Sequence, residues 1–371
     1  MKATVFALDR SITPDLDRFG PTFYQVTWPT VAGDLQRLFD DVHYRCAHLD
    51  GLNTALVALL PKTVGVPGPS NFHPVSLQNG DVKILSCALT SRLQQQIVGL
   101  IDEDQSSFLL GRSISENFVY AAELVQYCHK RAAPTIVFKL EFAKAFDSIV
   151  WSIAAILLND IPGRSFSVKK GLCQGDPISP YIFLLLTCRL QRLIQSDEVL
   201  RHPLVERAPP VVLQYADDAL IILCVDPAAE ARLRWILDLF AVATRLVINF
   251  SKRTLVPMHV NLVVLVAIVR SFQCSVGSFP RSYLGLPFSR DKLRLDDFDP
   301  LIAKVDRYLV GWRARLLFPA GRLVLINAVL DSIPTYAMPT MRLPPWCSLL
   351  STSFGGCSHG KSPIGPMGRG A

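Results

Sequence analysis

The sequence has few charged residues, no paired-cysteine motif and no long hydrophobic run. Charged residues make up 19% of its 371 positions and hydrophobic residues 50%, which excludes a disordered chain or a solvated coiled coil. Its nine scattered cysteines contain no Cys-x-x-Cys pair and therefore predict reduced core residues rather than disulfides or a zinc site. The longest apolar stretch, Val260–Val269, is shorter than the roughly 20 residues that cross a bilayer. We expect a packed globular protein with no membrane partner.

The amino-terminal segment and the net charge give weaker indications. Charge interrupts the first residues too early for a secretory signal peptide, so we expect an intracellular protein, nuclear or cytoplasmic, that is not secreted. The formal net charge of +7 is compatible with a polyanionic partner such as a nucleic acid. It is too small to decide the partner by itself.

Helical spacing of apolar residues predicts five helices in the first 245 residues. The segments are 34–44, about 83–100, 115–130, a stretch from about Ser179, and 231–245. Segment 54–62 is a short apolar run that ends near a proline, and the Gly- and Pro-rich segment 64–74 predicts a loop. Two basic stretches beyond Phe298 predict a separate helical unit, and the tail from Ser351 predicts disorder.

Two strand regions bring acidic residues next to apolar sequence. Thr135–Phe142 is rich in β-branched residues and predicts a buried strand. The apolar runs 211–215 and 219–225 flank only a short segment that contains Asp217 and Asp218, which predicts a tight hairpin with carboxylates at its tip. Charge beside buried strands is costly unless it is compensated, so a divalent metal is a natural partner. The alternative is an ordinary turn with both side chains in water.

Eight sequence blocks follow one another in a fixed order. They are LLPK with NFHPVSLQN and Lys83, DQSSFLLGRSISEN, KLEFAKAFDSIVW, GLCQGDPISPYIF, QYADD, TRLVINFSK, SYLGLP and WRARLLFPAGRLVLINAVLDSIP. In this order the chain resembles the reverse transcriptases of plant non-long-terminal-repeat retrotransposons over roughly residues 15–345. The resemblance implies an RNA-directed DNA polymerase that uses an RNA template, a DNA primer and deoxynucleoside triphosphates.

The resemblance also implies an α+β, right-hand polymerase fold. It divides the chain into an N-terminal extension and fingers (1–130), a palm with an antiparallel sheet and the catalytic carboxylates (131–290), a thumb-like helical region (291–350) and a disordered tail (351–371). Gln174 follows Asp147 by only 27 positions, where relatives place a long helical segment, so the palm is expected to be incomplete.

The catalytic set implied by the resemblance consists of Glu141, Asp217, Asp218 and Lys252. The three carboxylates would hold two Mg²⁺ ions, with Mn²⁺ as an alternative, because nucleotide addition is an in-line phosphoryl displacement assisted by two metals. Lys252 would protonate the departing pyrophosphate, although a surface lysine is an equal alternative. The family has Asp at position 141, and the extra methylene of Glu141 could lower the rate on the order of a hundredfold.

The implied nucleotide-binding set comes from several blocks. It comprises Lys62, His73, Lys83, Phe146, Gln174 and Gly175. Phe146 occupies the place of the side chain that selects deoxynucleotides, with an ordinary core aromatic as the alternative. The two lysines could be simply solvated, and the Gln-Gly pair could be a plain turn. His73 stands where the family has Arg, which predicts weaker triphosphate binding because imidazole lacks the guanidinium fork.

These departures indicate a degenerate copy, and three interpretations follow. The first is a reverse transcriptase domain of doubtful activity. The second is a catalytically impaired remnant that binds nucleic acid, with phosphate contacts from thumb arginines such as Arg313 and Arg315. The third is a mixed α/β scaffold with an incidental metal site, which leaves the order of the eight blocks unexplained.

Overall fold

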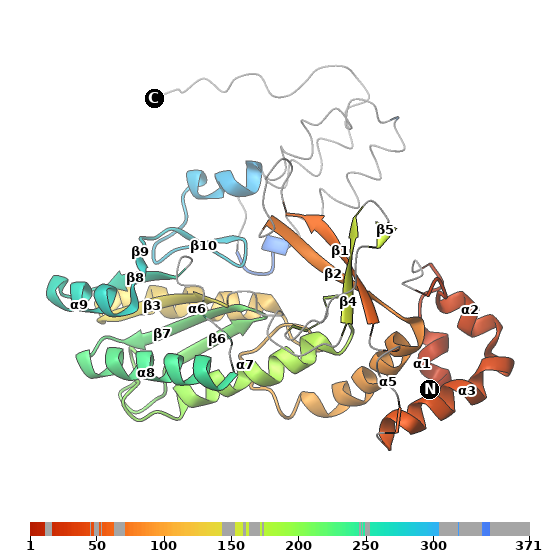
Figure 1. Cartoon of the computed structure of the whole chain (residues 1–371). Coiled ribbons are helices and arrows are strands. Elements are labelled where there is room, and N and C mark those ends of the chain that lie inside the picture. Colours follow the sequence, from red (N-terminus) through yellow and green to blue (C-terminus); the bar gives the residue numbers. More distant parts are fainter. Residues whose placement is uncertain are drawn as a thin grey trace. The chain divides into compact units, whose positions relative to one another are not determined.

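Figure 1 shows the computed structural model of the chain. It describes residues 1–11, 17–44, 46–47, 52, 54–62, 71–142, 153–158, 161–162, 171–172, 174–244, 246, 248, 253–303, 318 and 336–341. The predicted C-terminal basic helices and tail lie almost wholly outside these residues. The described chain contains both helices and strands, as the α+β prediction requires, and it divides into two compact units.

Helices and strands are interspersed along the chain. In chain order they are α1 (Lys2–Ala7), α2 (Pro21–Val26), α3 (Trp28–His43), β1 (Thr54–Pro61), β2 (Phe72–Gln78), α5 (Gly80–Ile97), α6 (Ile114–Lys130), β3 (Thr135–Glu141), β4 (Ile153–Leu158), β5 (Ile161–Pro162), α7 (Ser179–Gln195), β6 (Val211–Tyr215), β7 (Asp218–Cys224), α8 (Pro227–Thr244), β8 (Thr254–Met258), α9 (Leu262–Phe272), β9 (Ser275–Val276), β10 (Arg281–Tyr283), β11 (Leu286–Phe288) and a 3₁₀ helix (Leu295–Phe298).

The five predicted helices are confirmed, with shifted boundaries for some. The helix predicted at 34–44 begins earlier, at Trp28, where Pro29 suits the first turn of a helix. The helix predicted from Ser179 begins at that residue. Its start is stabilised by Asp176, whose carbonyl accepts from the Ser179 backbone N–H (3.2 Å) and whose carboxylate accepts from the Ile178 N–H (3.3 Å).

A five-stranded sheet of order β6-β7-β3-β8-β9 contains the predicted buried strand and hairpin. β3 pairs antiparallel with β7, and Phe138 lies opposite Ile221 in the register. Both side chains belong to one apolar cluster with residues of α7 and α8, such as Phe183 and Phe240. Because neighbours along a strand point to opposite faces, these helices cover the face that carries Phe138, and Lys139 and Glu141 belong to the other face.

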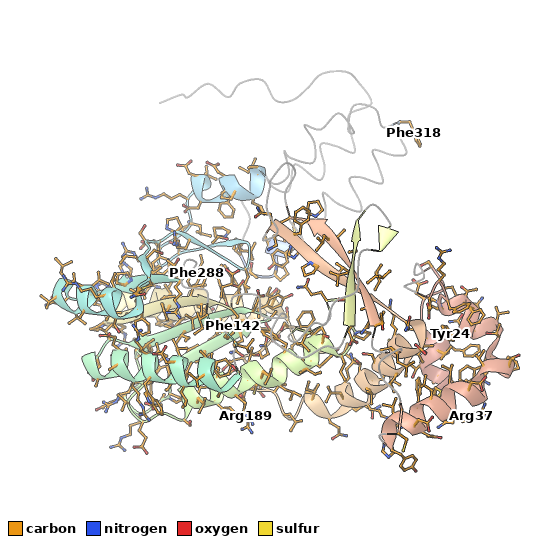
Figure 2. The ribbon with its side chains drawn as sticks, viewed as in Figure 1. Tyr24, Arg37, Phe142, Arg189, Phe288 and Phe318 are labelled. Carbon is orange, nitrogen blue, oxygen red and sulfur yellow. The ribbon has the colours of Figure 1, made fainter. Side chains whose placement is uncertain are left out.

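The end of β3 is anchored by Phe142, which Figure 2 labels beside the β6–β7 hairpin. Its ring lies 6.1 Å from the ring of Phe183 on α7 in an edge-to-face arrangement. Such aromatic pairs favour one orientation of the two elements that carry them. The residue immediately after Glu141 therefore holds the end of the strand against the core.

A second, four-stranded sheet has the order β2-β1-β4-β5. β1 pairs antiparallel with β2 and parallel with β4, which comes from the segment 153–158. The prediction that 64–74 is a loop is wrong for its last residues, because Phe72, His73 and Pro74 belong to β2. β2 is an edge strand, and an edge strand can hold a proline since one of its sides needs no ladder hydrogen bonds.

The N-terminal helices form a small cluster of their own. Val5, Tyr24 and Leu35 from α1–α3 pack with Ile84 of α5, and Figure 2 labels Tyr24 there. The Asp17 carboxylate accepts a hydrogen bond from the Gly80 N–H at the start of α5 (2.6 Å). Among the described residues, no helix has the length and apolar character needed to cross a membrane.

Candidate active site

The predicted carboxylates meet at one end of the five-stranded sheet. The register pairs Glu141, the last residue of β3, with Asp218, the first residue of β7. Asp218 also pairs with Tyr215 across the β6–β7 hairpin, so only Ala216 and Asp217 form the turn. Residues that lie directly opposite in such a pair have Cβ atoms about 5 Å apart. The structure therefore places Glu141 beside the Asp217–Asp218 turn.

A lysine shares the face on which Glu141 and Asp218 lie. Lys139 is two residues before Glu141, and its Nζ lies 3.4 Å from Asp218 Oδ1. Alternation along β3 places Lys139 and Glu141 on the same face, away from the apolar cluster with α7 and α8. The site is therefore a polar end of β3 and β7, whose other residues are mostly buried.

Burial and neighbouring charges both act on the Asp218 carboxylate. Burial raises the pKa of Asp218 above its ordinary value; Lys139 opposes that shift, while Asp217 and Glu141 add to it. A raised carboxyl pKa means that the ionised form is not fully compensated by the surrounding protein. A divalent cation would supply the missing compensation.

The donor chemistry fits Mg²⁺, although the described residues provide no closed cage. Among them, no group of three or more His, Cys, Asp or Glu side chains is arranged to hold a metal ion. Mg²⁺ usually keeps several waters and binds through one or two carboxylates together with substrate phosphates. A pair of carboxylates at the end of a sheet is therefore a suitable platform for the ion, with further ligands expected from a bound nucleotide.

The Gln174-Gly175 pair lies against the four-stranded sheet. The Ser76 N–H of β2 donates to the Gln174 carbonyl (2.8 Å). Gly175 has φ +109°, and a Cβ there would lie 3.3 Å from the Ser76 carbonyl oxygen, so both conformation and space favour glycine. The Asp176 carboxylate accepts a hydrogen bond from the Ser86 hydroxyl of α5. The loop before α7 is thus tied to β2 and α5.

The other predicted nucleotide-binding residues are not all brought together. Lys62 follows β1 and His73 lies opposite Leu60 in β2, so these two exposed residues share one end of the β1–β2 pair. Lys83 lies in the first turn of α5, beyond the other end of β2. Phe146 and Lys252 lie outside the described residues.

Gln105 and Ser107 have no role predicted from the sequence, although both belong to the DQSSFLLGRSISEN block. In the structure Gln105 forms a parallel bridge with Gln214 of β6, and Ser107 contacts the turn that carries Asp217. Their position could have indicated a role, because both are polar residues in a block that resembles the family. Periodicity could not reveal them, because they belong to no helix or strand.

Comparison with known proteins decides the family. The model of the family described as reverse transcriptase (RNA-dependent DNA polymerase) matches residues 60–288, which is more than half of the chain. The chain belongs to the reverse transcriptase family. The matched range contains the three carboxylates and the Gln174-Gly175 loop, and the family acts on RNA templates.

The similar sequences include proteins of non-long-terminal-repeat retrotransposons. The chain is 25% identical over 357 residues to the 149 kDa protein of transposon TX1 of Xenopus laevis, covering 86% of this chain and 26% of that protein. It is 27% identical over 181 residues to the Pol polyprotein of the R2DM element of Drosophila melanogaster, covering 41% and 17%. The reverse transcriptase therefore spans about a quarter or less of the length of these relatives, and corresponds to the reverse transcriptase domain of such Pol-like proteins.

Two further similarities are shorter or weaker. A segment of 59 residues is 37% identical to an Arabidopsis thaliana protein that carries the name of a ribonuclease H, covering 16% of this chain and 10% of that protein. Telomerase from Candida albicans, solved with a fragment of telomeric RNA, aligns over 87% of this chain and 60% of its own with 9% identity and a TM-score of 0.38.

Proposed function

We propose that this reverse transcriptase domain extends a DNA primer on an RNA template, using deoxynucleoside triphosphates and two Mg²⁺ ions, with Mn²⁺ as an alternative. The observation that carries the proposal is the pairing of Glu141 with Asp218 beside Asp217, inside the range that matches the family. Two bound Mg²⁺ ions would stabilise the attacking and leaving oxygens of the phosphoryl transfer.

The residues of the chain have separate tasks in this proposal. Glu141, Asp217 and Asp218 would supply carboxylate ligands at the end of the sheet, and waters and nucleotide phosphates would complete the coordination of the ions. Gln174 and Gly175 lie on a loop whose exposed glycine permits close approach of a nucleotide. Lys62 and Lys83 attract phosphates as point charges, Phe146 limits the space at the sugar 2′ position, and Lys252 donates the proton to pyrophosphate.

The domain division is part of the same proposal. It consists of fingers at 1–130, a palm at 131–290 with a shortened segment after Asp147, a thumb at 291–350 and a disordered tail at 351–371. The position of β3 and β7, which carry the carboxylates, within 131–290 supports the assignment of the palm. We also propose that the chain comes from a plant element, which the 37% identity to the Arabidopsis thaliana protein over 59 residues supports.

We further propose that this copy is degenerate and slow. Glu141 replaces the family Asp at the first ligand position, and a longer carboxylate in a fixed sheet moves the metal away from the geometry that Mg²⁺ requires. His73 replaces the family Arg and lies exposed on β2, where an imidazole lacks the guanidinium fork that binds a triphosphate.

The second candidate is a remnant that binds nucleic acid without polymerising. The Lys139–Asp218 ion pair favours it, because a lysine Nζ already lies 3.4 Å from a ligand oxygen. Basic residues such as Lys62 would still contact phosphates in this case, and the affinity for nucleic acid would fall as the salt concentration rises.

One pair of variants separates these functions. We expect the purified chain to extend a DNA primer on RNA with Mg²⁺ or Mn²⁺, and Asp217→Asn with Asp218→Asn to reduce extension to background while RNA binding stays, because phosphate contacts lie elsewhere. The matched control is Asp40→Asn with Asp41→Asn, which removes two adjacent charges from the exposed face of α3.

The outcomes of this experiment decide between the candidates. Extension that persists in the Asp217 and Asp218 double variant would refute the assignment of the site. RNA binding by the unaltered chain without extension, with either metal, would establish the remnant instead.

A further inference from the structure

A short segment outside the regular elements supports the carboxylate turn from the β6 side. Ser106 N–H donates to the Gln214 carbonyl (3.1 Å), and Gln214 N–H donates to the Asp104 carbonyl (3.0 Å). This pattern is the parallel bridge between Gln105 and Gln214. Gln105 and Ser107 are 0% and 1% exposed, so their polar groups depend on protein partners.

The buried side chains form a continuous set of hydrogen bonds that ends at the turn. Gln214 Nε2 donates to the Thr187 carbonyl of α7 (3.2 Å), and Gln105 Nε2 donates to Gln214 Oε1 (3.3 Å). The Ser107 hydroxyl donates to Gln105 Oε1 (2.8 Å) and accepts from the Ala216 N–H (2.9 Å). One hydroxyl thus uses both its donor and an acceptor site, which fixes its orientation.

The residue at the end of this set has an unusual backbone conformation. Ala216 has φ +52°, in the left-handed region that non-glycine residues rarely adopt. Such a conformation persists when the surroundings hold it. Ala216 directly precedes Asp217 and Asp218, so its backbone torsions set the direction in which the Asp217 side chain leaves the turn.

We propose that Ser107 is a positioning residue for the metal site, which it serves by holding Ala216 in the left-handed conformation through the Oγ···H–N bond. The inference rests on the proposed function, since it assumes that Asp217 and Asp218 bind the metal. Without the hydroxyl, the Ala216 N–H and Gln105 Oε1 each lose a buried partner, and the turn is free to adopt other conformations. The carboxylates would then spend less time in the arrangement that binds a cation.

The adjacent serine provides a matched control. Ser106 is 6% exposed, in the same segment, and its hydroxyl has no hydrogen-bond partner in the described part of the chain. Ser106→Ala and Ser107→Ala therefore remove the same atom from the same buried environment. They differ in the contact with the turn.

The test measures Mn²⁺ binding to the full chain by the loss of the free-ion electron paramagnetic resonance signal. We expect Ser107→Ala to weaken Mn²⁺ binding about fivefold to tenfold, the effect of losing one buried hydrogen bond, and Ser106→Ala to leave it unchanged. Ser107→Cys keeps the side-chain shape with a weaker hydrogen bond and should lie between them. It gives the decisive measurement if the alanine variant does not fold.

A rescue distinguishes positioning from a general loss of packing. Adding Ala216→Gly to Ser107→Ala should restore most of the Mn²⁺ affinity, because glycine adopts positive φ without steric cost. Weak binding that this change does not restore would overturn the claim that Ser107 acts through the turn.

The remaining outcomes separate the inference from the proposed function. Equal Mn²⁺ affinities for the Ser106 and Ser107 variants, in a chain whose binding disappears with Asp217→Asn and Asp218→Asn, would overturn the inference and leave the proposed function. Binding that survives the aspartate double variant would overturn the proposed function, and the inference with it.

Discussion

The two sheets of the reverse transcriptase differ in how deeply their strands are buried. In β3 and β7 nearly every residue apart from the carboxylates is buried, whereas most residues of β1 and β2 are only partly buried. The first sheet ends in Glu141 and Asp218, and the second carries the exposed basic residues Lys62 and His73. Metal ligands need fixed geometry, while phosphate contacts made by point charges tolerate movement.

The difference explains why each sheet suits its proposed task. A strand that is packed on both faces cannot shift its register, because a slip of one residue would exchange every buried side chain for the opposite face. A half-exposed sheet retains its strand pairing, and its long exposed side chains can change rotamer to contact a bound nucleic acid. Burial therefore predicts where sequence changes will be costly.

The largest expected effect compares one truncation in each sheet. Leu140 in β3 is 0% exposed and Leu60 in β1 is 54% exposed. We expect Leu140→Ala to lower the free energy of unfolding by about 2–5 kcal/mol through lost burial and a cavity. Leu60→Ala should change it by less than about 0.5 kcal/mol. Urea unfolding of both variants would measure the contrast, and equal losses would contradict it.

The next effect tests whether the buried sheet holds its ligands rigidly. Glu141→Asp shortens the carboxylate by one methylene and should raise the Mg²⁺-dependent rate of primer extension, by up to about a hundredfold if position 141 limits the reaction. The measurement is single-turnover extension on a primed RNA. Asp40→Glu, on the exposed face of α3, changes side-chain length without touching the site. An unchanged rate for Glu141→Asp would place the limitation elsewhere, for instance at His73.

The smallest effect concerns a partly buried carboxylate beside β6. Burial raises the pKa of Asp104 above its ordinary value; a hydrogen bond from Gln195 opposes the shift, and nearby Asp102 and Glu103 add to it. The folded chain therefore holds this proton more tightly than the unfolded chain, so the contribution to stability is present at low pH and is lost as pH rises through the folded pKa.

Asp104→Asn removes this titration. We expect the variant to melt at a slightly higher temperature than the parent at pH 7, and the difference to shrink as pH approaches 4. Asp41→Asn, at an exposed position, controls for the change of charge alone. A difference that is the same at both pH values would contradict the assignment.

The sequence predicted the local structure of the buried sheet well. The β-branched run at Thr135–Glu141 and the short gap between two apolar runs around Asp217 are strong local signals, and both are confirmed as strand and hairpin. The juxtaposition of Glu141 with Asp218 followed from the resemblance to the family. No local pattern gives the pairing of strands so far apart in the chain.

The second sheet shows where sequence reasoning stops. Pro74 and nearby glycines indicated a loop, but tertiary pairing with β1 makes a strand of Phe72–Gln78. The parallel pairing of β1 with β4 is a long-range contact that periodicity does not encode. The role of Ser107 was not predicted from the sequence for a similar reason, since its Oγ accepts a hydrogen bond from the N–H of Ala216, which lies 109 positions away in the sequence.

The position of Pro74 also bears on whether another strand can pair with the outer edge of β2. Side-by-side copies of an open sheet can join through unsatisfied N–H groups, which is a route to aggregation. The Ser76 N–H is turned away from β1 and already donates to Gln174, and Pro74, two residues earlier on the same side, has no N–H to offer. Another strand therefore finds no free N–H at these two positions on the outer edge of β2. Pro74 lacks an N–H, and the Ser76 N–H is taken by the Gln174 loop that we assign to nucleotide binding.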